Sequence, residues 1–352
     1  MNEQPPPAPD ATVRCPDVPG ADVVTVRDFR SDDEPRVLEL LQGAFGRWPL
    51  GLDAVQPQEF FRWKHQSSPF GRSTMLVAEI GGAPVGFMAM MPWRLSFDGR
   101  LHETRRSVDL AVDPAVHRRG VSLRLIGAGP SRHSDEVVLG WSNPNERSRG
   151  GAAKSGRTGV SGPRRFVGLG GAQWRTLGRL VPPAGQPPSC QALAAASAGA
   201  VLDDRALVSR LLAGSRPGDG LISTAVDAEF LRWRYGWPET YRAVVATHAG
   251  RAGLAIFRVQ RRGRLSRALV CELLVERDDP RLTRRLVQGV RRAARADFLV
   301  VAMGSDRVAA RCGLAPLLPG TTIYVNPLRE GLVPDPTRPA AWALSLGDLE
   351  LV

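Results

Sequence analysis

Apolar and polar residues follow two spacings along the chain, an alternation typical of strands and a three-to-four-residue spacing typical of helices. Alternation over residues 23–29 predicts a strand, and Ser31 or Asp32 could cap a following helix that ends near Phe45. The "GG" pair at 81–82 predicts a hairpin turn. The same rules predict, in order, a helix at 57–65, strands at 74–80, 84–91, 94–97 and 104–114, a helix at 120–128, a strand at 135–142 and a helix at 146–155.

The pattern weakens after this region and then restarts. Residues 181–220 are rich in proline and alanine, which favours a linker with a short helix or two. From about residue 221 the chain predicts a helix at 227–235, strands at 240–247, 252–260 and 267–276, a helix at 280–295, a strand at 297–302 and a helix at 305–312.

A short repeat links the two regions. The chain reads "EFFRWKH" at 59–65 and "EFLRWRY" at 229–235, and each copy precedes a predicted strand. We interpret this as a duplicated domain, with copies at 21–180 and 221–327. An N-terminal arm at 1–20 and a C-terminal tail at 328–352 complete the predicted organisation. The two tryptophans are expected to fill the core, and the arginines before them to bind local carbonyls or carboxylates.

Composition limits the classes of function. The chain of 352 residues carries a net charge of +12, and lysine occurs only at Lys64 and Lys154, so 45 of its 47 basic residues are arginine. A GC-rich genome would produce this bias, although a basic face for an anionic ligand is the alternative. No aromatic-interleaved RNA motif accompanies the arginines, so nucleic acid is not the expected partner.

Several other classes have no sequence support. The chain has no apolar run of about 18 residues, and its Pro-rich start lacks an apolar signal core, so we expect a cytoplasmic protein without a membrane span. Four scattered cysteines form no CxxC pair, and five histidines show no HxxxH spacing, so no metal site is expected.

The stretch "VDLAVDPAVHRRGVSLRLI" at 108–126 carries the clearest chemistry. A predicted strand ends at Pro114, a short basic loop follows, and a helix begins after Gly120. The first amides of a helix lack intrahelical partners and lie at the positive end of its dipole. Such a junction suits an anion such as a pyrophosphate, and Gly120 would allow close approach to the backbone.

With these elements in this order, residues 22–180 resemble the GCN5-related N-acetyltransferase (GNAT) superfamily. Its pyrophosphate loop reads Gln/Arg-x-x-Gly-x-Gly/Ala, and here the spacing gives His117, Gly120 and Ser122, of which only Gly120 matches. The resemblance implies an α+β, or α/β, fold: a mixed, mostly antiparallel sheet flanked by helices, present in two tandem copies. It also implies acetyl-CoA or another acyl-CoA as co-substrate and a small-molecule amine as acceptor, with the oligomeric state left open.

The resemblance also assigns site residues. The backbone of the fourth strand would pair with the pantetheine arm, the loop would hold the phosphates, and an asparagine would follow the fifth strand. The position of the family's thiolate-protonating tyrosine is Ala152, which is a clear departure. The cofactor-binding residues implied in this way are Leu110, Ala111, Val112, His117, Arg118, Arg119, Gly120, Val121, Ser122 and Asn145.

The residues that would move protons are less clear. Asp109 lies in the fourth strand, Glu103 lies before it, and Ser148 is a nearby hydroxyl, so these three are the candidate catalytic residues. The simpler interpretation of both carboxylates is a solvated or salt-bridged group rather than a catalytic base. Trp141 and Asn143 could line the acceptor side.

The second copy has lost the loop. Where the first copy reads "HRRGVS", the second reads "DDPRLT", which places acidic residues where phosphates would bind. We therefore expect a second domain that keeps the fold and covers the acceptor side of the first. Three hypotheses remain: an acyl-CoA-dependent N-acyltransferase, a non-catalytic acyl-CoA-binding or scaffold protein, and a transferase that also engages a polyanion.

Overall fold

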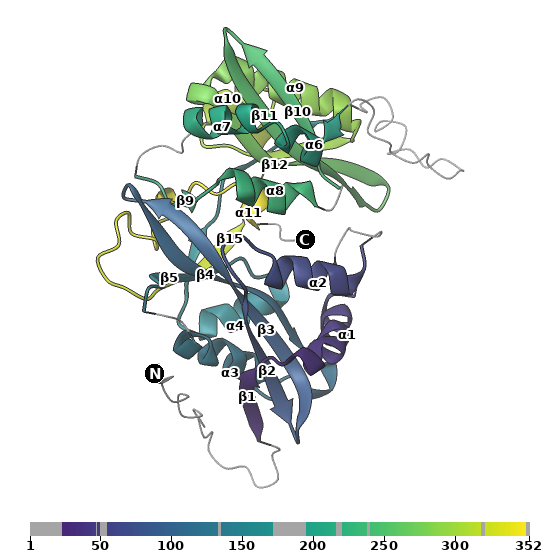
Figure 1. The fold of residues 1–352 in the computed structure, drawn as a ribbon, viewed down its shortest axis with the longest axis vertical. Helices are drawn as coiled ribbons and strands as arrows, with labels where there is room; N and C mark the ends of the chain where they lie inside the picture. Colours follow the sequence, from purple (N-terminus) through teal and green to yellow (C-terminus); the bar gives the residue numbers. More distant parts are fainter. Residues whose placement is uncertain are drawn as a thin grey trace, which may run out of the picture.

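A computed structural model describes residues 23–46, 48–49, 55–132, 135–171, 195–215, 220–237, 240–317 and 321–349. The predicted N-terminal arm and residues 181–194 and 216–219 of the predicted linker lie outside these residues, while the rest of that linker contains two helices of the second half. Two sheets dominate the structure, one in each half of the chain, with helices on their faces (Figure 1). None of the helices in the described part is long and apolar enough to cross a membrane.

The first half follows the predicted order closely. It contains β1 (Val24–Asp28), α1 (Glu34–Phe45), α2 (Pro57–Gln66), β2 (Thr74–Ile80), β3 (Ala83–Phe97), β4 (Arg100–Val112), α3 (Val121–Ala128), β5 (Leu139–Ser142), α4 (Glu146–Lys154), β6 (Thr158–Ser161) and β7 (Arg165–Leu169). The hairpin at Gly81 and Gly82 is confirmed, since both glycines have positive φ and join β2 to β3.

One prediction in this half needs correction. The sequence suggested two strands around Pro92, at 84–91 and 94–97, whereas β3 is a single strand. Pairing with β2 ends at Met90 and pairing with β9 begins at Leu95, so Pro92 has a neighbouring strand on one edge only. The missing N–H of a proline is tolerated at such a place.

The second half repeats this order. It contains β8 (Ala196–Ser197), α6 (Ala198–Leu202), α7 (Arg205–Gly214), β9 (Ser223–Thr224), α8 (Ala228–Gly236), β10 (Arg242–His248), β11 (Arg251–Arg262), β12 (Leu265–Val275), α9 (Pro280–Ala294), β13 (Phe298–Ala302), α10 (Asp306–Arg311), β14 (Ala315–Pro316), β15 (Thr322–Pro327) and α11 (Leu346–Leu349).

The two sheets exchange a strand. The first has the order β1-β2-β3-β4-β5-β15-β6, with β9 beside β3, and the second has the order β8-β10-β11-β12-β13-β7-β14. Each sheet is antiparallel except at one pair, β4 with β5 and β12 with β13. Strand β7 therefore completes the second sheet, and β15 completes the first. The predicted domain limits remain a prediction, but pairing across them ties the halves together.

The repeated Arg–Trp pairs lie where the halves meet. Trp63 Nε1 donates to the carbonyl oxygen of Trp233 at 3.0 Å, and Trp233 Nε1 donates to that of Trp63 at 3.2 Å. Their rings stack with centroids 5.0 Å apart. Reciprocal contacts between equivalent residues are what a local two-fold relation between two copies produces.

The arginines of the repeat have the predicted structural role. Arg62 Nη2 donates to Glu34 at 3.2 Å, and Arg232 forms an ion pair with Asp203. Both tryptophans are buried. The expectation of tryptophan as core and arginine as a partner of local acids is confirmed.

The C-terminal segment lies inside the molecule. Ala341, Trp342, Leu344 and all four residues of α11 are buried, and several of them join the core cluster that spans both halves. Helix α11 sits between the upper and lower halves in Figure 1. The predicted Pro-containing tail is thus partly a structural core segment.

Candidate functional site

Strands β4 and β5 form a fork. They run parallel and pair only from Thr104 to Arg106, opposite Leu139 to Trp141. Beyond Arg106, β4 continues to Val112 with β3 on one edge, and no strand of the described chain pairs with its other edge. The other edge of β5 pairs with β15. An extended ligand could add main-chain hydrogen bonds to the open edge of β4.

The two faces of the fork are distinct. Met90 pairs with Ser107 and belongs to the core cluster beneath α3, so Ser107 faces α3 and α4. Met91 pairs with Arg106 and belongs to the cluster that includes α1, α2 and the second half. By alternation along β5, Trp141 lies on the Arg106 face and Ser142 on the Ser107 face.

A bulge interrupts β4 just past the fork. Val108 pairs with Ala89 and Ala111 pairs with Phe87, so two residues of β4 lie opposite one of β3. Asp109 in the bulge has a φ of 53°, a left-handed conformation that costs a non-glycine residue about 1–2 kcal/mol. A conformation of this kind persists where neighbouring contacts hold it.

Those contacts come from the repeat in α2. Lys64 Nζ lies 2.8 Å from one carboxylate oxygen of Asp109, and His65 Nε2 lies 3.0 Å from the same oxygen. A carboxylate only accepts, so His65 donates from Nε2 and its Nδ1 accepts from Ser73 Oγ at 3.0 Å. The side chains of Lys64 and His65 are 1% and 0% exposed.

The contacts with Lys64 and His65 determine whether Asp109, one of the predicted catalytic residues, can accept a proton. Burial raises the pKa of Asp109, but the charge of Lys64 and the hydrogen bond from His65 outweigh it and hold that pKa well below its usual range. Burial lowers the pKa of Lys64 and of His65. A carboxylate held so firmly in its ionised form is a poor proton acceptor near neutral pH. The catalytic role of Asp109 remains a prediction without geometric support.

The other catalytic candidates lie apart from Asp109. Glu103 is six residues earlier on β4, about 20 Å away along an extended strand, and its carboxylate accepts from Arg94 Nε at 2.7 Å. Ser148 is in the first turn of α4, where its Oγ donates to Asn145 Oδ1 at 2.9 Å. Asn145 caps α4 by accepting from the Ser148 amide. These assignments remain predictions, and the structure does not gather them at one point.

The basic loop has the conformation expected of an anion site. Arg118 and Gly120 have φ values of 67° and 76°, and Gly120 caps α3 without a side-chain bond. His117, Arg118 and Arg119 are exposed. No backbone acceptor within the described residues serves the amides of Val121, Ser122 and Leu123, which are the first of α3. A Cβ at Gly120 would meet nothing within 4 Å, so positive φ is what favours glycine there.

The equivalent place in the second half is already filled. Asp279 caps α9 and accepts from the amides of Arg281 at 2.9 Å and Leu282 at 3.2 Å. Its other oxygen lies 3.0 Å from His248 Nδ1. Hydrogen bonds from His248 and from these amides lower the pKa of Asp279 to about 2. An internal carboxylate thus takes the position that a ligand phosphate would need.

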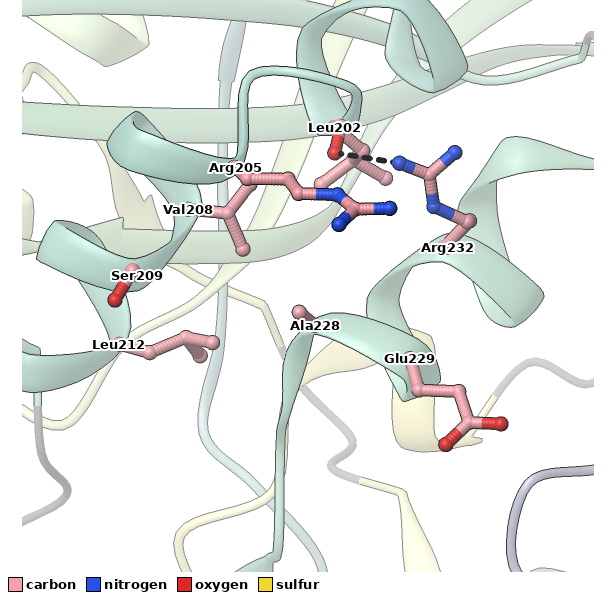
Figure 2. Close-up of a pocket in the computed structure, with 8 residues that line it drawn as sticks. All are labelled: Leu202, Arg205, Val208, Ser209, Leu212, Ala228, Glu229 and Arg232. Carbon is pink, nitrogen blue, oxygen red and sulfur yellow. Dashed lines mark hydrogen bonds between the residues drawn. The ribbon is translucent and has the colours of Figure 1, made fainter.

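A separate groove lies in the second half of the chain. It lies between α7 and α8 of the second half, and Figure 2 shows Arg205 on the α7 side of it and Arg232 and Glu229 on the α8 side. Arg232 Nη2 donates to the Leu202 carbonyl at 3.3 Å. No residue of the fork or of the loop at 117–122 lines this groove.

Comparison with known proteins gives the fold. No family model matches, and no curated protein matches at the level of sequence. A probable N-acyltransferase from Enterococcus faecalis V583 shares 12% identity with a TM-score of 0.58, covering 87% of this chain and 73% of its own. A GCN5-related N-acetyltransferase from Kribbella flavida shares 15% identity with a TM-score of 0.56, covering 87% and 71%.

The chain has the GNAT fold. Saccharomyces cerevisiae N-myristoyltransferase, solved with bound myristoyl-CoA, shares 12% identity with a TM-score of 0.51 and covers 92% of this chain and 86% of its own. That alignment spans both halves, so the tandem arrangement is included in the likeness. The predicted GNAT-like, mostly antiparallel fold is confirmed.

Sequence reasoning missed three features of the region around the fork. The pair Lys64 and His65 follows the repeated tryptophan, so the repeat itself could have drawn attention to it. Arg106 is buried at the fork, where its Nη2 donates to Asn143 Oδ1 at 2.8 Å and to the Leu349 carbonyl at 3.0 Å. Arg157 lies on the opposite face, and nothing in the local pattern singles it out.

Proposed function

We propose that the protein is an acyl-CoA-dependent N-acyltransferase that moves an acyl group, acetyl in the simplest case, directly to an amine on a small molecule. The observation that carries this proposal is one continuous arrangement in the first half. An open strand edge at β4 begins at the fork and leads to a helix terminus with unpaired amides. The second half keeps the fold but has its equivalent terminus filled by Asp279.

The loop would hold the pyrophosphate. The amides of Val121, Ser122 and Leu123 supply directed donors, and the exposed Arg118 and Arg119 supply positive charge. The pantetheine arm would then pair with β4 along Leu110, Ala111 and Val112, as an added strand does. Asn145 stands at the start of α4 and would border the same arm.

The thioester would lie at the fork. The bulge at Asp109 breaks the regular ladder of β4, and its backbone N–H groups would stabilise the oxyanion that forms when the amine attacks. Lys64 and His65 would act by fixing the bulge. Holding amine and thioester together supplies much of the rate in a reaction of this kind.

The amine would enter from the face of α2 and the second half. That face contains Arg106, Asn143 and Trp141, and it is bounded by α11. Trp141 is fully buried beneath Trp93 and Trp342, so of the two predicted lining residues Asn143 is the better placed. The second half would serve as the wall of the acceptor site.

A non-catalytic acyl-CoA-binding protein is the second candidate. Ala152 is buried and brings no hydroxyl to α4, and Ser148 is engaged with Asn145. To separate the two, acetyl-CoA is incubated with the protein and a panel of primary amines while released thiol is followed. Amine-dependent thiol release supports the enzyme. Tight acetyl-CoA binding without thiol release in the presence of any amine of the panel would favour the second candidate.

A further inference from the structure

Arg157 bridges the two strands at the fork. It lies just before β6, and its Nη1 donates to Ser107 Oγ on β4 at 3.3 Å and to Ser142 Oγ on β5 at 3.5 Å. Ser107 is the first β4 residue beyond the paired segment, and Ser142 is the last residue of β5. The guanidinium therefore spans the point where the strands separate, on the face of α3 and α4.

The charge of Arg157 has no counter-ion in the described part of the chain. No carboxylate lies within ion-pair distance of it, and its two partners are neutral hydroxyls. The side chain is half-buried, and burial lowers the pKa of its guanidinium. A cation that loses hydration on burial and has no carboxylate partner is suited to bind an anion that belongs to a ligand.

The proposed function, on which this inference rests, supplies such an anion. The anion loop at 117–122 and Ser107 lie on the same side of the sheet, since Val121 packs in the cluster that Met90 shares. A thioester whose acyl group passes through the fork would leave its sulfur on the α3 and α4 face. Arg157, Ser107 and Ser142 are the polar groups grouped there.

We propose that Arg157 is a catalytic residue that binds the thiolate leaving group, assisted by the hydroxyls of Ser107 and Ser142. The amine nitrogen attacks the thioester carbon, a C–N bond forms, the C–S bond breaks and the electron pair moves to sulfur. The resulting thiolate pairs with Arg157 and later takes a proton from solvent. The amine gives up its proton to solvent water on the opposite face, so the two proton transfers balance and no additional reactant is needed.

This assignment explains how the chain works with Ala152 at its position in α4. A nearby cation lowers the pKa of a thiol by stabilising the thiolate, so the leaving group need not be protonated as the C–S bond breaks. Ala152 is buried and cannot contribute a proton. The positive charge of Arg157, in the segment that follows α4, stabilises the thiolate, so an acid that protonates it is not required.

The test measures the thiol pKa of CoA bound to the intact protein, which requires no acceptor. The rate of alkylation of bound CoA by iodoacetamide is followed against pH for wild type, Arg157→Gln, Arg157→Lys and the control Arg149→Gln. Arg149 is an exposed arginine on α4. We expect wild type, Arg157→Lys and Arg149→Gln to lower the thiol pKa by about one unit from that of free CoA, and Arg157→Gln to lose this shift.

The outcomes are distinguishable. A thiol pKa in Arg157→Gln equal to that in wild type would overturn the inference while leaving the proposed function intact. If Arg157→Gln does not fold, Arg157→Lys decides, because a free-CoA thiol pKa in that folded variant would also overturn it. Failure of wild type to bind CoA at all would instead remove the proposed function.

Discussion

Replacing Asp109 tests whether its contacts hold the left-handed bulge of β4. Asp109→Ala and Asp109→Gly both remove the carboxylate and both leave Lys64 buried without its partner, which costs about 3–5 kcal/mol for an unpaired buried charge. That loss is shared, so it cancels when the two variants are compared. What differs is the backbone, because alanine at a φ of 53° carries about 1–2 kcal/mol of strain and glycine carries almost none.

The expected order is the reverse of the usual one. Glycine within a strand is ordinarily about 0.5–1 kcal/mol less stable than alanine. Subtracting this from the strain leaves Asp109→Gly more stable than Asp109→Ala by roughly 0.5–1 kcal/mol. Urea denaturation at neutral pH measures both free energies of unfolding, and Val108→Gly with Val108→Ala, on the regular neighbouring position, provides the matched control in which alanine should be favoured.

The stability of Asp109→Ala relative to Asp109→Gly decides whether the bulge is strained. If Asp109→Ala is as stable as Asp109→Gly or more stable, the bulge is not under the strain that its φ implies. Lys64→Met added to each variant removes the unpaired charge and should raise both stabilities by a similar amount. An acyl-transfer assay adds a second criterion, because glycine should then preserve more activity than alanine.

Two further predictions concern the interface and the interior. Trp63→Ala and Trp233→Ala should each lower the free energy of unfolding by about 3–5 kcal/mol. Because each indole donates to the backbone of the other residue, the double variant should show a coupling energy of about 0.5–3 kcal/mol. Additive losses in denaturant titrations would contradict the reciprocal contact. Burial, with Asp348 nearby, raises the pKa of Glu272 to about 8. Its contribution to stability is therefore present below pH 4.5 and is lost as the pH rises to about 8. Glu272→Gln keeps the acceptor for Tyr235 and should flatten the decline of stability across this window, by at most about 1.4 kcal/mol per pH unit; identical slopes would show that Glu272 does not titrate there.

Local patterns predicted the elements well, because each depends on residues near in sequence. Helices α1 to α4 and strands β1, β2, β4 and β5 lie close to their expected positions, as do their counterparts from α8 to α10, whereas β3 joins two strands that were expected to be separate. The fork, the bulge and the loop all fall within residues 22–180, over which the sequence resembles the GNAT superfamily. The role of Gly120 could be predicted from the sequence, because a positive φ depends on one residue and its own turn.

The long-range features could not be derived in the same way. Strands β7 and β15 are short, and each pairs with strands from the other half, more than a hundred residues away in sequence. The ion cluster at Asp109 joins residues 44 and 45 positions apart, and Arg157 meets Ser107 across 50 positions. Such contacts depend on sheet order and register, which composition and periodicity do not determine.

Calorimetric titration of acetyl-CoA into wild type and Ser122→Glu tests whether the helix terminus at Val121 binds the phosphates of acyl-CoA. Ser122 lies in the first turn of α3, where a glutamate favours the helix dipole by about 0.3–1 kcal/mol and so should not harm folding. It would place a carboxylate at the anion site, much as Asp279 does in the second half, while Ser122→Ala serves as control. We predict saturable binding by wild type and Ser122→Ala and its loss in Ser122→Glu. Equal binding by all three proteins, or none by wild type, would show that this helix terminus does not hold the phosphates.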